Sequence, residues 1–542
     1  MLQRLKNWFA GTGGRGRNAP AAAPPAAPAT QSAIEAALSA CPDDADLNYR
    51  VGLRQLAEGD AAGALDHFHL ALHWAPGLFP ACAARVRALV ALGRSSEEAN
   101  AYREFLRANP GHPEATYALA VWHHARGEFE PALDLLRPLV GGPSLKREAC
   151  NLLGLILGRE FGQFEDGERF LRLALEPDPL WPVALSNLGW ILLEKGDHAQ
   201  GLKLLDAALA RDPGDHETRL VRSYMNLKRG EFESGWRDYE ARHHSRFAMP
   251  RQSDFPQWDG TPLDGKTLLV RGEQGFGDQI MFASCLHEAI ARAGRCIIEC
   301  DPRLVALFRR SFPTAIVEAS APPAGHAAWT RQGLSVDCQI PMGSLPRLFR
   351  NRWEDFPRHA GYLHAAPERV AHWRVRLDAL GPGAKIGLSW RGGVAVTRRH
   401  LRSLALQEFL PLLRLPAKFV SLQYGDCASD LNALSREHGV ILPHWQDALD
   451  DYDETAALVC ALDLVISVCT AVIHLAGALG KPVWILVPAV AEWRYLDRGE
   501  VMPWYPSARL FRQTTSGPWQ EVLRQVAEQT SSLTQTTGPS GS

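Results

Sequence analysis

The chain has 542 residues, of which 46% are hydrophobic and 22% are charged, and its formal net charge is -2. This composition is typical of a soluble globular protein of about three domains, and the near-zero charge gives no indication of nucleic-acid binding. The ten cysteines include no CxxC pair, which argues against a zinc site or a disulfide framework and favours a reducing, cytoplasmic setting. No apolar run reaches the roughly 18 residues that span a bilayer, so no transmembrane segment is expected.

Residues 1–44 are predicted to be an N-terminal tail and linker. The tail begins "MLQRLKNWFA", and two interpretations of it stay open. Leu2, Leu5, Trp8 and Phe9 could form a short amphipathic helix that touches the inner face of the membrane, although a frayed terminus is favoured. Residues 19–30 are rich in Ala and Pro, a composition typical of a linker.

Residues 45–245 contain an internal repeat with a spacing of about 34 residues, the period of the tetratricopeptide repeat. The segments "LNYRVGLRQLAEGDAAGALDHFHLALHWAP" and "ALSNLGWILLEKGDHAQGLKLLDAALARDP" align without gaps. Glycines recur at the expected inter-helix turn, at Gly59, Gly93, Gly127, Gly162, Gly196 and Gly230. The pattern resembles the tetratricopeptide family, with about six copies. Such an all-α solenoid has a concave groove, and we favour protein binding there over a purely structural spacer.

From residue 264, short apolar runs alternate with helical stretches, a pattern that predicts parallel β-sheets. The first lobe is assigned to 246–380, with expected strands "TLLVRG", "CIIEC" and "AIVEA" and helices over 279–293 and 303–311. The second is assigned to 381–530, with expected strands "IGLSW", "KFVSLQ", "GVILP", "DLVIS" and "PVWILVP" and helices over 407–413, 428–437, 453–461 and 470–479. Residues 531–542 are expected to be a disordered tail. Ligands of such doubly wound sheets bind beyond the carboxyl ends of the strands.

The first strand of this half leads into the turn "GEQGFGD". The third glycine of a dinucleotide fingerprint is missing, because Ile280 follows Gly275 and Gly277 at that position. Asp278 and Glu273 would also repel a phosphate at the start of the following helix. We therefore expect Asp278 to point into a cleft, to cap the helix, or to do both.

A second turn, "VISVCTAVIHLAGALG", follows a later strand. Thr470 or Cys469 could cap the next helix, and no carboxylate lies in its first turn, so its free N–H groups at Ala471 could receive a phosphate. His474 lies one turn inside this helix. Plain packing of the helix on the sheet is the alternative interpretation.

Arginines gather after another strand, in "SWRGGVAVTRRHLRSLAL". Arg391 and Arg402 could bring guanidinium groups onto a diphosphate, or the loop could be a solvated surface. Trp493, Trp504 and Tyr505 belong to an aromatic cluster near the C-terminus. They could stack on a base or a sugar, but more of them are expected to pack the lobes together.

These motifs together resemble a known group. A tetratricopeptide array joined to two α/β lobes resembles the protein O-GlcNAc transferases, and the lobes resemble the ADP-heptose:lipopolysaccharide heptosyltransferases. The Gly-Asp turn corresponds to "GFGD", and the D-[ST]-x-x-x-H segment to "CTAVIHLAGALGKP". Repeat-bearing bacterial proteins with "GEQGxGD" and "WYPxxRLFRQ", some resembling flagellin glycosyltransferases, are also similar. The resemblance extends over residues 45 to 520.

The resemblance implies a GT-B fold of two Rossmann-like lobes, the donor lobe being the C-terminal one. Asp278 would be the catalytic base, and Gly275, Gly277 and Gln279 would form the acceptor-side turn. The donor phosphates would be bound by five residues, Thr470, Ala471, His474, Arg391 and Arg402. Transfer would be inverting, with a nucleotide-sugar as co-substrate, no cofactor and no metal.

The chain departs from this group at Cys469, where an acid is usual. A lone thiol without a base partner is not expected to be a nucleophile. The leading hypothesis is a glycosyltransferase acting on a protein recruited by the repeats, with flagellin or another surface protein as candidate acceptor. The alternatives are a scaffold whose transferase lobes have decayed, and an enzyme that acts on a glycan or lipid precursor.

Overall fold

The computed structural model describes residues 40–142, 144–245, 255–320, 334–392, 399–515 and 517–536. The chain forms two compact units, Met1–Ile191 and Leu192–Ser542. The possible membrane-contact residues Leu2, Leu5, Trp8 and Phe9, and the Ala/Pro linker, lie outside the described residues. Within the described ranges, no helix is both long and apolar enough to cross a bilayer.

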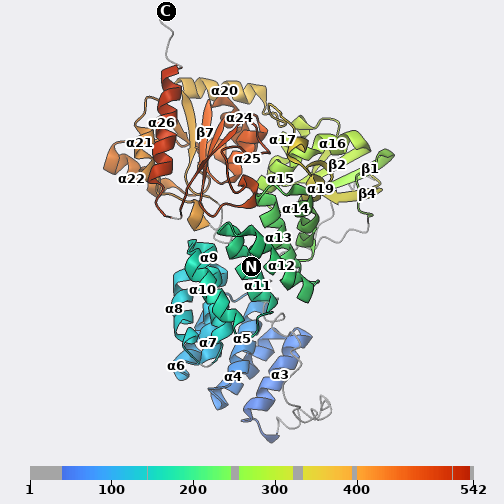
Figure 1. Ribbon diagram of the computed structural model, residues 1–542, viewed down its shortest axis with the longest axis vertical. Coiled ribbons are helices and arrows are strands. Elements are labelled where there is room, and N and C mark those ends of the chain that lie inside the picture. The colour runs from blue at the N-terminus through green and yellow to red at the C-terminus, as the bar shows by residue number, and fades with distance from the viewer. Residues whose placement is uncertain are drawn as a thin grey trace, which may run out of the picture. The chain divides into compact units, whose positions relative to one another are not determined.

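The first half is helical, as Figure 1 shows in blue to green. Its twelve helices form six consecutive pairs, which confirms the predicted repeats: α3 Ala45–Glu58, α4 Ala61–Trp74, α5 Phe79–Ala91, α6 Glu98–Ala108, α7 Pro113–Arg126, α8 Phe129–Val140, α9 Lys146–Phe161, α10 Phe164–Leu175, α11 Pro182–Glu194, α12 His198–Arg211, α13 His216–Lys228 and α14 Phe232–Tyr239.

The glycines of the repeat have the two roles that the sequence predicts. All six turn glycines have positive φ, between 68° and 93°. Residues other than glycine rarely adopt this backbone conformation. Within the helices, glycine permits close approach. A Cβ built on Gly52 would lie 2.6 Å from the ring of Phe68, so α3 and α4 could not pack as they do with a larger residue there.

The first lobe contains a four-stranded parallel sheet in the order β3-β2-β1-β4. Its strands are β1 Leu263–Arg271, β2 Ala293–Cys300, β3 Ile316–Ala319 and β4 Cys338–Pro341, and its helices are α15 Phe276–Phe282, α16 Leu286–Arg292, α17 Val305–Ser311 and α19 Leu345–Phe349. The single helix expected over 279–293 is wrong in detail, because a 3-10 turn at Ala283–Cys285 separates α15 from α16.

The second lobe contains a five-stranded parallel sheet in the order β6-β5-β7-β8-β9. Its strands are β5 Lys385–Ser389, β6 Lys418–Ser421, β7 Leu464–Val468, β8 Val483–Val487 and β9 Ala508–Arg512. Its helices are α21 Leu410–Leu413, α22 Ala428–His438, α23 Gln446–Asp450, α24 Tyr452–Ala461, α25 Ala471–Ala478 and α26 Gln520–Thr536. Every residue of the strands β5, β7 and β8 is buried, which explains why their sequences are continuous apolar runs.

Three expectations for this lobe need correction. The run "GVILP" is not a strand: it leads to an isolated bridge between Ser421 and His444, and Ile441 is 81% exposed. The edge strand β9 was not expected from the sequence. Residues 531–536 are not a disordered tail but the end of α26, a helix held by the buried Val522 and Val526.

The helix α20 Pro367–Asp378 lies in the segment assigned to the first lobe, yet it packs on the second. The indole N–H of Trp373 donates to Glu454 of α24 at 2.8 Å, and Arg369 pairs with the same carboxylate. The chain therefore crosses to the second lobe before residue 381.

The last repeat packs with the lobes. The compact units divide after Ile191, whereas the predicted boundary lies at residue 245. The reason is an aromatic cluster in which Trp236 of α14 contacts Phe282 of α15, Trp493 and Trp504, with ring centroids 5.4 to 6.4 Å apart. The indole N–H of Trp236 also donates to the carbonyl of Arg350 at 2.8 Å.

We expect Trp236→Ala to lower the free energy of unfolding by about 3–5 kcal/mol, because it leaves a cavity shared by the last repeat and both lobes. The control is Trp353→Ala, since Trp353 is 45% exposed, and it should cost less than about 1 kcal/mol. Calorimetry of the full chain measures both. Equal losses for the two variants would contradict a central role for Trp236.

Candidate functional site

In a doubly wound sheet, ligands bind where the connections leave neighbouring strands toward opposite faces. The strand orders place these points between β1 and β4 in one lobe, and between β5 and β7 in the other. The loops at the carboxyl ends of these strands contain Asp278 after β1 and Thr470 after β7. Both turns singled out in the sequence therefore lie at topological switch points.

The two turns lie against each other. A Cβ built on Gly277 of α15 would lie 3.3 Å from the Cβ of Ala471 and 3.6 Å from the ring of His474, both in α25. Gly277 therefore lets the first turn of α15 approach the first turn of α25. Asp278 and Thr470 are brought to one site by this approach, although they are 192 residues apart in the sequence.

Asp278 makes an ion pair with Arg494, a residue that follows β8. The Arg494 Nε lies 3.0 Å from Asp278 Oδ1, and Nη2 contacts the same oxygen. Arg494 Nη1 pairs with Glu492 at 2.8 Å. Burial alone would lower the pKa of Arg494, but the carboxylates of Asp278 and Glu492 outweigh it and raise that pKa. Both contacts of Asp278 use Oδ1, so Oδ2 is the oxygen that could meet another molecule.

The expected capping role of Asp278 is wrong. The N-cap of α15 is Gly275, and Asp278 lies three residues later, inside the first turn. It is the acidic residue of that first turn. Gln279, expected in the acceptor-side turn, points into the fold. It is 5% exposed, and its Oε1 accepts the backbone N–H of Asp301 at 2.8 Å, so it joins the ends of β1 and β2.

The start of α25 has the features predicted for an anion site. Thr470 is the N-cap but makes no capping hydrogen bond with its side chain, and the first turn holds no acidic residue. Arg402 lies beside it, donating from Nη1 to the carbonyl of Cys469 at 3.0 Å. Gly392 makes room, because a Cβ there would lie within 3.3 Å of Arg402, Thr470 and the Cys469 carbonyl.

Arg391 is not placed with this group. It lies two residues beyond the end of β5, not at the end of the strand as expected. Its guanidinium donates to the carbonyl of Asp426 at 2.6 Å and lies 3.2 Å from Asp430 of α22. Its charge is therefore already paired on the α22 side of the loop. Of the two arginines predicted to bind phosphate, Arg402 is the one that the structure brings to α25.

His474 is buried, and its Nδ1 lies 3.0 Å from the hydroxyl of Tyr505. Burial, reinforced by the charge of Arg494, lowers the pKa of His474 to about 3. The imidazole is consequently neutral near pH 7. It can orient a neighbour by hydrogen bonding, but it supplies no positive charge to a phosphate.

Cys469 and the aromatic residues are structural in this fold. Burial raises the pKa of the Cys469 thiol to about 12, so it is not a thiolate nucleophile. Trp493, Trp504 and Tyr505 are at most 6% exposed. They pack the lobes together, as the sequence favoured, and are not available to stack on a base.

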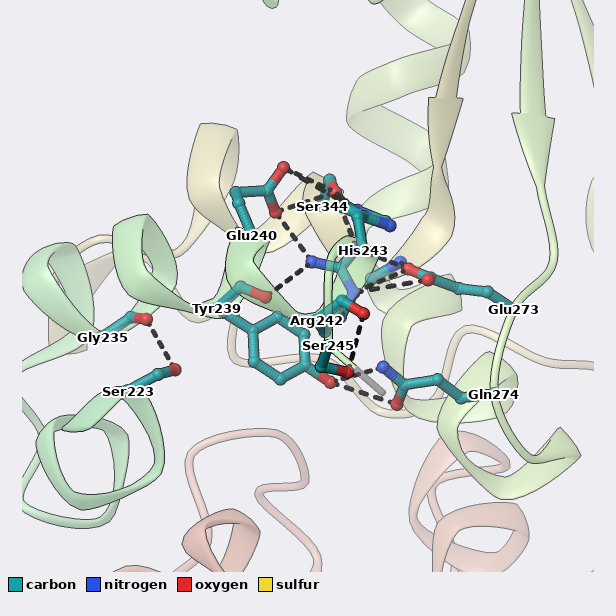
Figure 2. Close-up of polar contacts among 11 residues, drawn as sticks. Ser223, Gly235, Tyr239, Glu240, Arg242, His243, Ser245, Glu273, Gln274 and Ser344 are labelled. Carbon is teal, nitrogen blue, oxygen red and sulfur yellow. Dashed lines mark hydrogen bonds and ion pairs between the residues drawn. The ribbon is translucent and has the colours of Figure 1, made fainter. Parts of the chain in front are cut away.

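Sequence reasoning missed the partners of Glu273, which Figure 2 shows. Arg242 follows α14, in the 3-10 turn Glu240–His243, and pairs with both Glu240 and Glu273. Glu273 also accepts the backbone N–H of Gly343 at 2.9 Å. Burial alone would lower the pKa of Arg242, but the two carboxylates raise it. The turn after β1 is thus tied to the last repeat, and no local sequence signal indicates this pairing.

Gln274 makes a second link between the turn and the repeat. Its side chain exchanges hydrogen bonds with the Tyr239 hydroxyl at 2.8 and 3.1 Å (Figure 2). Its φ is 61°, an unusual value for a residue other than glycine. Such backbone strain persists only where the surrounding contacts hold it.

Comparison with known proteins agrees with the helical half of this description. A family model for the tetratricopeptide repeat matches residues 83–143 and 160–241, and the chain is a tetratricopeptide-repeat protein with a parallel-sheet α/β half. It is 32% identical over 495 residues to protein FlbA of Caulobacter vibrioides, covering 86% of this chain and 81% of that protein. The chain belongs to the FlbA family.

Two solved structures each match about a third of this chain. YrrB, described as a tetratricopeptide protein with an unusual peptide-binding site, is 22% identical and covers 34% of this chain and 95% of its own, with a TM-score of 0.28. MamA of Desulfovibrio magneticus RS-1 is 22% identical and covers 32% of this chain and 96% of its own, with a TM-score of 0.27. Scores this low add nothing to the description of the lobes.

The low pKa of His474 predicts a pH effect on stability. Unfolding returns the imidazole to its ordinary pKa of 6.5. Between pH 6.5 and about 3 the unfolded chain binds more protons, so the free energy of unfolding falls as the pH falls, by up to about 1.4 kcal/mol per pH unit. The slope should be shallower in His474→Gln and unchanged in the control His438→Gln, whose histidine is exposed. Thermal unfolding from pH 4.5 to 7 measures this; identical slopes would contradict it.

We expect Glu273→Gln to lower the free energy of unfolding by about 3 kcal/mol, because it removes a carboxylate from the buried Arg242. Asp134→Asn is the control, since it breaks an exposed ion pair with Arg137 and should change stability by less than about 1 kcal/mol. Chemical denaturation of the full chain compares the two. If Glu273→Gln lowered the free energy of unfolding as little as the control does, Glu240 alone would be enough to pair the buried charge of Arg242.

Proposed function

We propose that this chain is a glycosyltransferase with a GT-B arrangement of its two lobes. It would move a sugar from a nucleotide-sugar to a hydroxyl of a protein that the repeats recruit. The observation that supports the proposal most directly is the contact between α15 and α25. This contact brings the carboxylate of Asp278, after β1, close to the start of α25, after β7. Sugar transfer from a nucleotide-sugar needs a base and an anion site close together in this way.

The donor diphosphate would lie at the start of α25. The N–H groups of the first helical turn and the guanidinium of Arg402 would balance its charge as the leaving group departs. His474, being neutral, would help to position the helix end through its bond to Tyr505. Under this proposal the charge is balanced by protein groups, so transfer would need no metal.

The acceptor hydroxyl would meet Asp278. Its oxygen would attack the anomeric carbon while the bond from that carbon to the diphosphate breaks, and Oδ2 of Asp278 would take the hydroxyl proton. A single displacement of this kind inverts the anomeric configuration. The ion pair between Oδ1 and Arg494 would hold the carboxylate in one orientation throughout.

The acceptor is proposed to be a protein, because tetratricopeptide repeats form extended concave surfaces that commonly bind other chains. Flagellin or another surface protein is the candidate, modified in the cytoplasm or at the inner face of the membrane. A glycan or lipid precursor would use the same lobes without the repeats.

A second candidate function is a protein-binding scaffold with inactive lobes. Two observations favour it: Asp278 is already paired with Arg494, and a buried, protonated Cys469 stands where the resembling enzymes have an acid. Binding of a nucleotide-sugar distinguishes the two proposals. The transferase must bind one, whereas a scaffold with inactive lobes is not expected to.

The test is Asp278→Asn in the full chain. Donor binding should persist, measured as a thermal shift with ADP-, GDP-, UDP- and CMP-linked sugars without metal. Transfer should fall by about 100- to 10,000-fold, because the general base is lost. Mass spectrometry of surface and flagellar proteins, in a deletion strain complemented with each variant, measures transfer.

Asp259→Asn is the control, since Asp259 is an exposed carboxylate of the same lobe. Transfer that survives in Asp278→Asn would exclude this residue as the base. The absence of a thermal shift with every donor class, together with unmodified proteins in the wild type, would favour the scaffold.

A further inference from the structure

A hollow of about 340 Å³ lies within the unit formed by residues 192–542, away from Asp278 and Thr470. One wall is the turn between α11 and α12, with Lys195 and His198, together with the end of α13. The other wall is formed by second-lobe residues, including Ala489 and Arg498, that follow β8. This volume is within the range of small-ligand pockets.

The two walls are fixed to each other. The backbone N–H of Asp497 donates to the carbonyl of Lys228 at 2.9 Å. The ammonium of Lys228 is paired with Glu194, and both side chains are at least nine-tenths buried. The hollow is therefore a preformed feature of the fold, with a buried ion pair in its wall.

The lining residues include more cationic side chains than carboxylates. Four are cationic, namely Lys195, Lys228, Arg229 and Arg498, against the two carboxylates Glu194 and Asp497. Arg498 is 91% exposed and lies 3.8 Å from Asp497, a distance too long for a strong pair. The guanidinium of Arg229 makes no hydrogen bond or ion pair with any residue that the structure describes.

We infer that this hollow binds a phosphoryl group of a small molecule, at a site separate from the one proposed for the donor. The two guanidinium groups of Arg229 and Arg498 match the two charges of a phosphate dianion. Arginines on opposite walls can each offer two parallel N–H groups to phosphate oxygens. The position agrees, because Ala489 lies just beyond the carboxyl end of β8, on the side of the sheet where ligands of this architecture bind.

This inference does not rest on the proposed transferase activity. A phosphoryl ligand would touch the last repeats and the second lobe at once, and so would stabilise their association. Inorganic phosphate, pyrophosphate and ADP share the recognised group. Comparing them separates free phosphate from the diphosphate of a nucleotide, and succinate serves as the carboxylate counterpart.

The experiment is isothermal titration of the full chain carrying Arg402→Gln, a background that weakens the proposed donor site. We expect saturable pyrophosphate binding in this background, reduced about tenfold by adding Arg229→Gln and about tenfold by adding Arg498→Gln. Arg229→Lys should retain part of the affinity because it keeps the charge. Adding Lys203→Gln, an exposed lysine of α12 outside the hollow, should change nothing.

Several results would overturn the inference. One is the absence of pyrophosphate and phosphate binding in the Arg402→Gln background. Another is unchanged affinity in both arginine variants, with thermal unfolding showing that they remain folded. Succinate binding as tight as pyrophosphate binding would exclude selectivity for phosphate and point to carboxylates. None of these results depends on whether a sugar is transferred.

Discussion

The buried aromatic cluster around Trp236 is the packing on which the second compact unit depends. Its rings come from three parts of the chain: α14 of the last repeat, α15 of the first lobe and the segment after β8 of the second. Large aromatic side chains bury more area than any others and pack in preferred tilted geometries. Because one cluster receives all three parts, the last repeat is a structural component of the lobes as well as a member of the solenoid. A fragment that begins after residue 245 would lack Trp236 itself.

Arg494 shows how this packing determines the chemistry of the site. It follows Trp493 of the cluster directly, and its guanidinium lies 4.5 Å from the Trp493 ring. A buried guanidinium must be paired, since an isolated charge is costly away from water. Asp278 and Glu492 provide that pairing, from different lobes. The orientation of Asp278 is consequently set by a residue of the second lobe, and the turn after β1 cannot be understood from its own lobe alone.

Periodicity and glycine spacing predicted the repeats and most of the strands, because these signals are local and follow directly from backbone geometry. The same local reasoning found Asp278 and Thr470, each at the end of an apolar strand. It did not find Arg494, Arg242 or the last turns of α26, because their roles arise from contacts between distant segments. It also overestimated Arg391, since nothing near that residue in the sequence indicates that Asp430 would pair with it.

Four residues of the turn "GEQGFGD" each contact a different distant residue. Glu273 forms an ion pair with Arg242, and Gln274 is hydrogen-bonded to Tyr239. Gly277 allows the close approach of Ala471, and Asp278 forms an ion pair with Arg494. The first two contacts lead to the last repeat and the last two to the second lobe, and all four residues lie within the seven residues of the turn. Gln274, the second of these residues, has the unusual positive φ. The residues that contact Arg242 and Arg494 therefore lie within one short segment of the chain. The site proposed in the lobes is thus joined, through neighbouring residues of a single turn, to contacts with the last repeat, whatever partner the repeats hold.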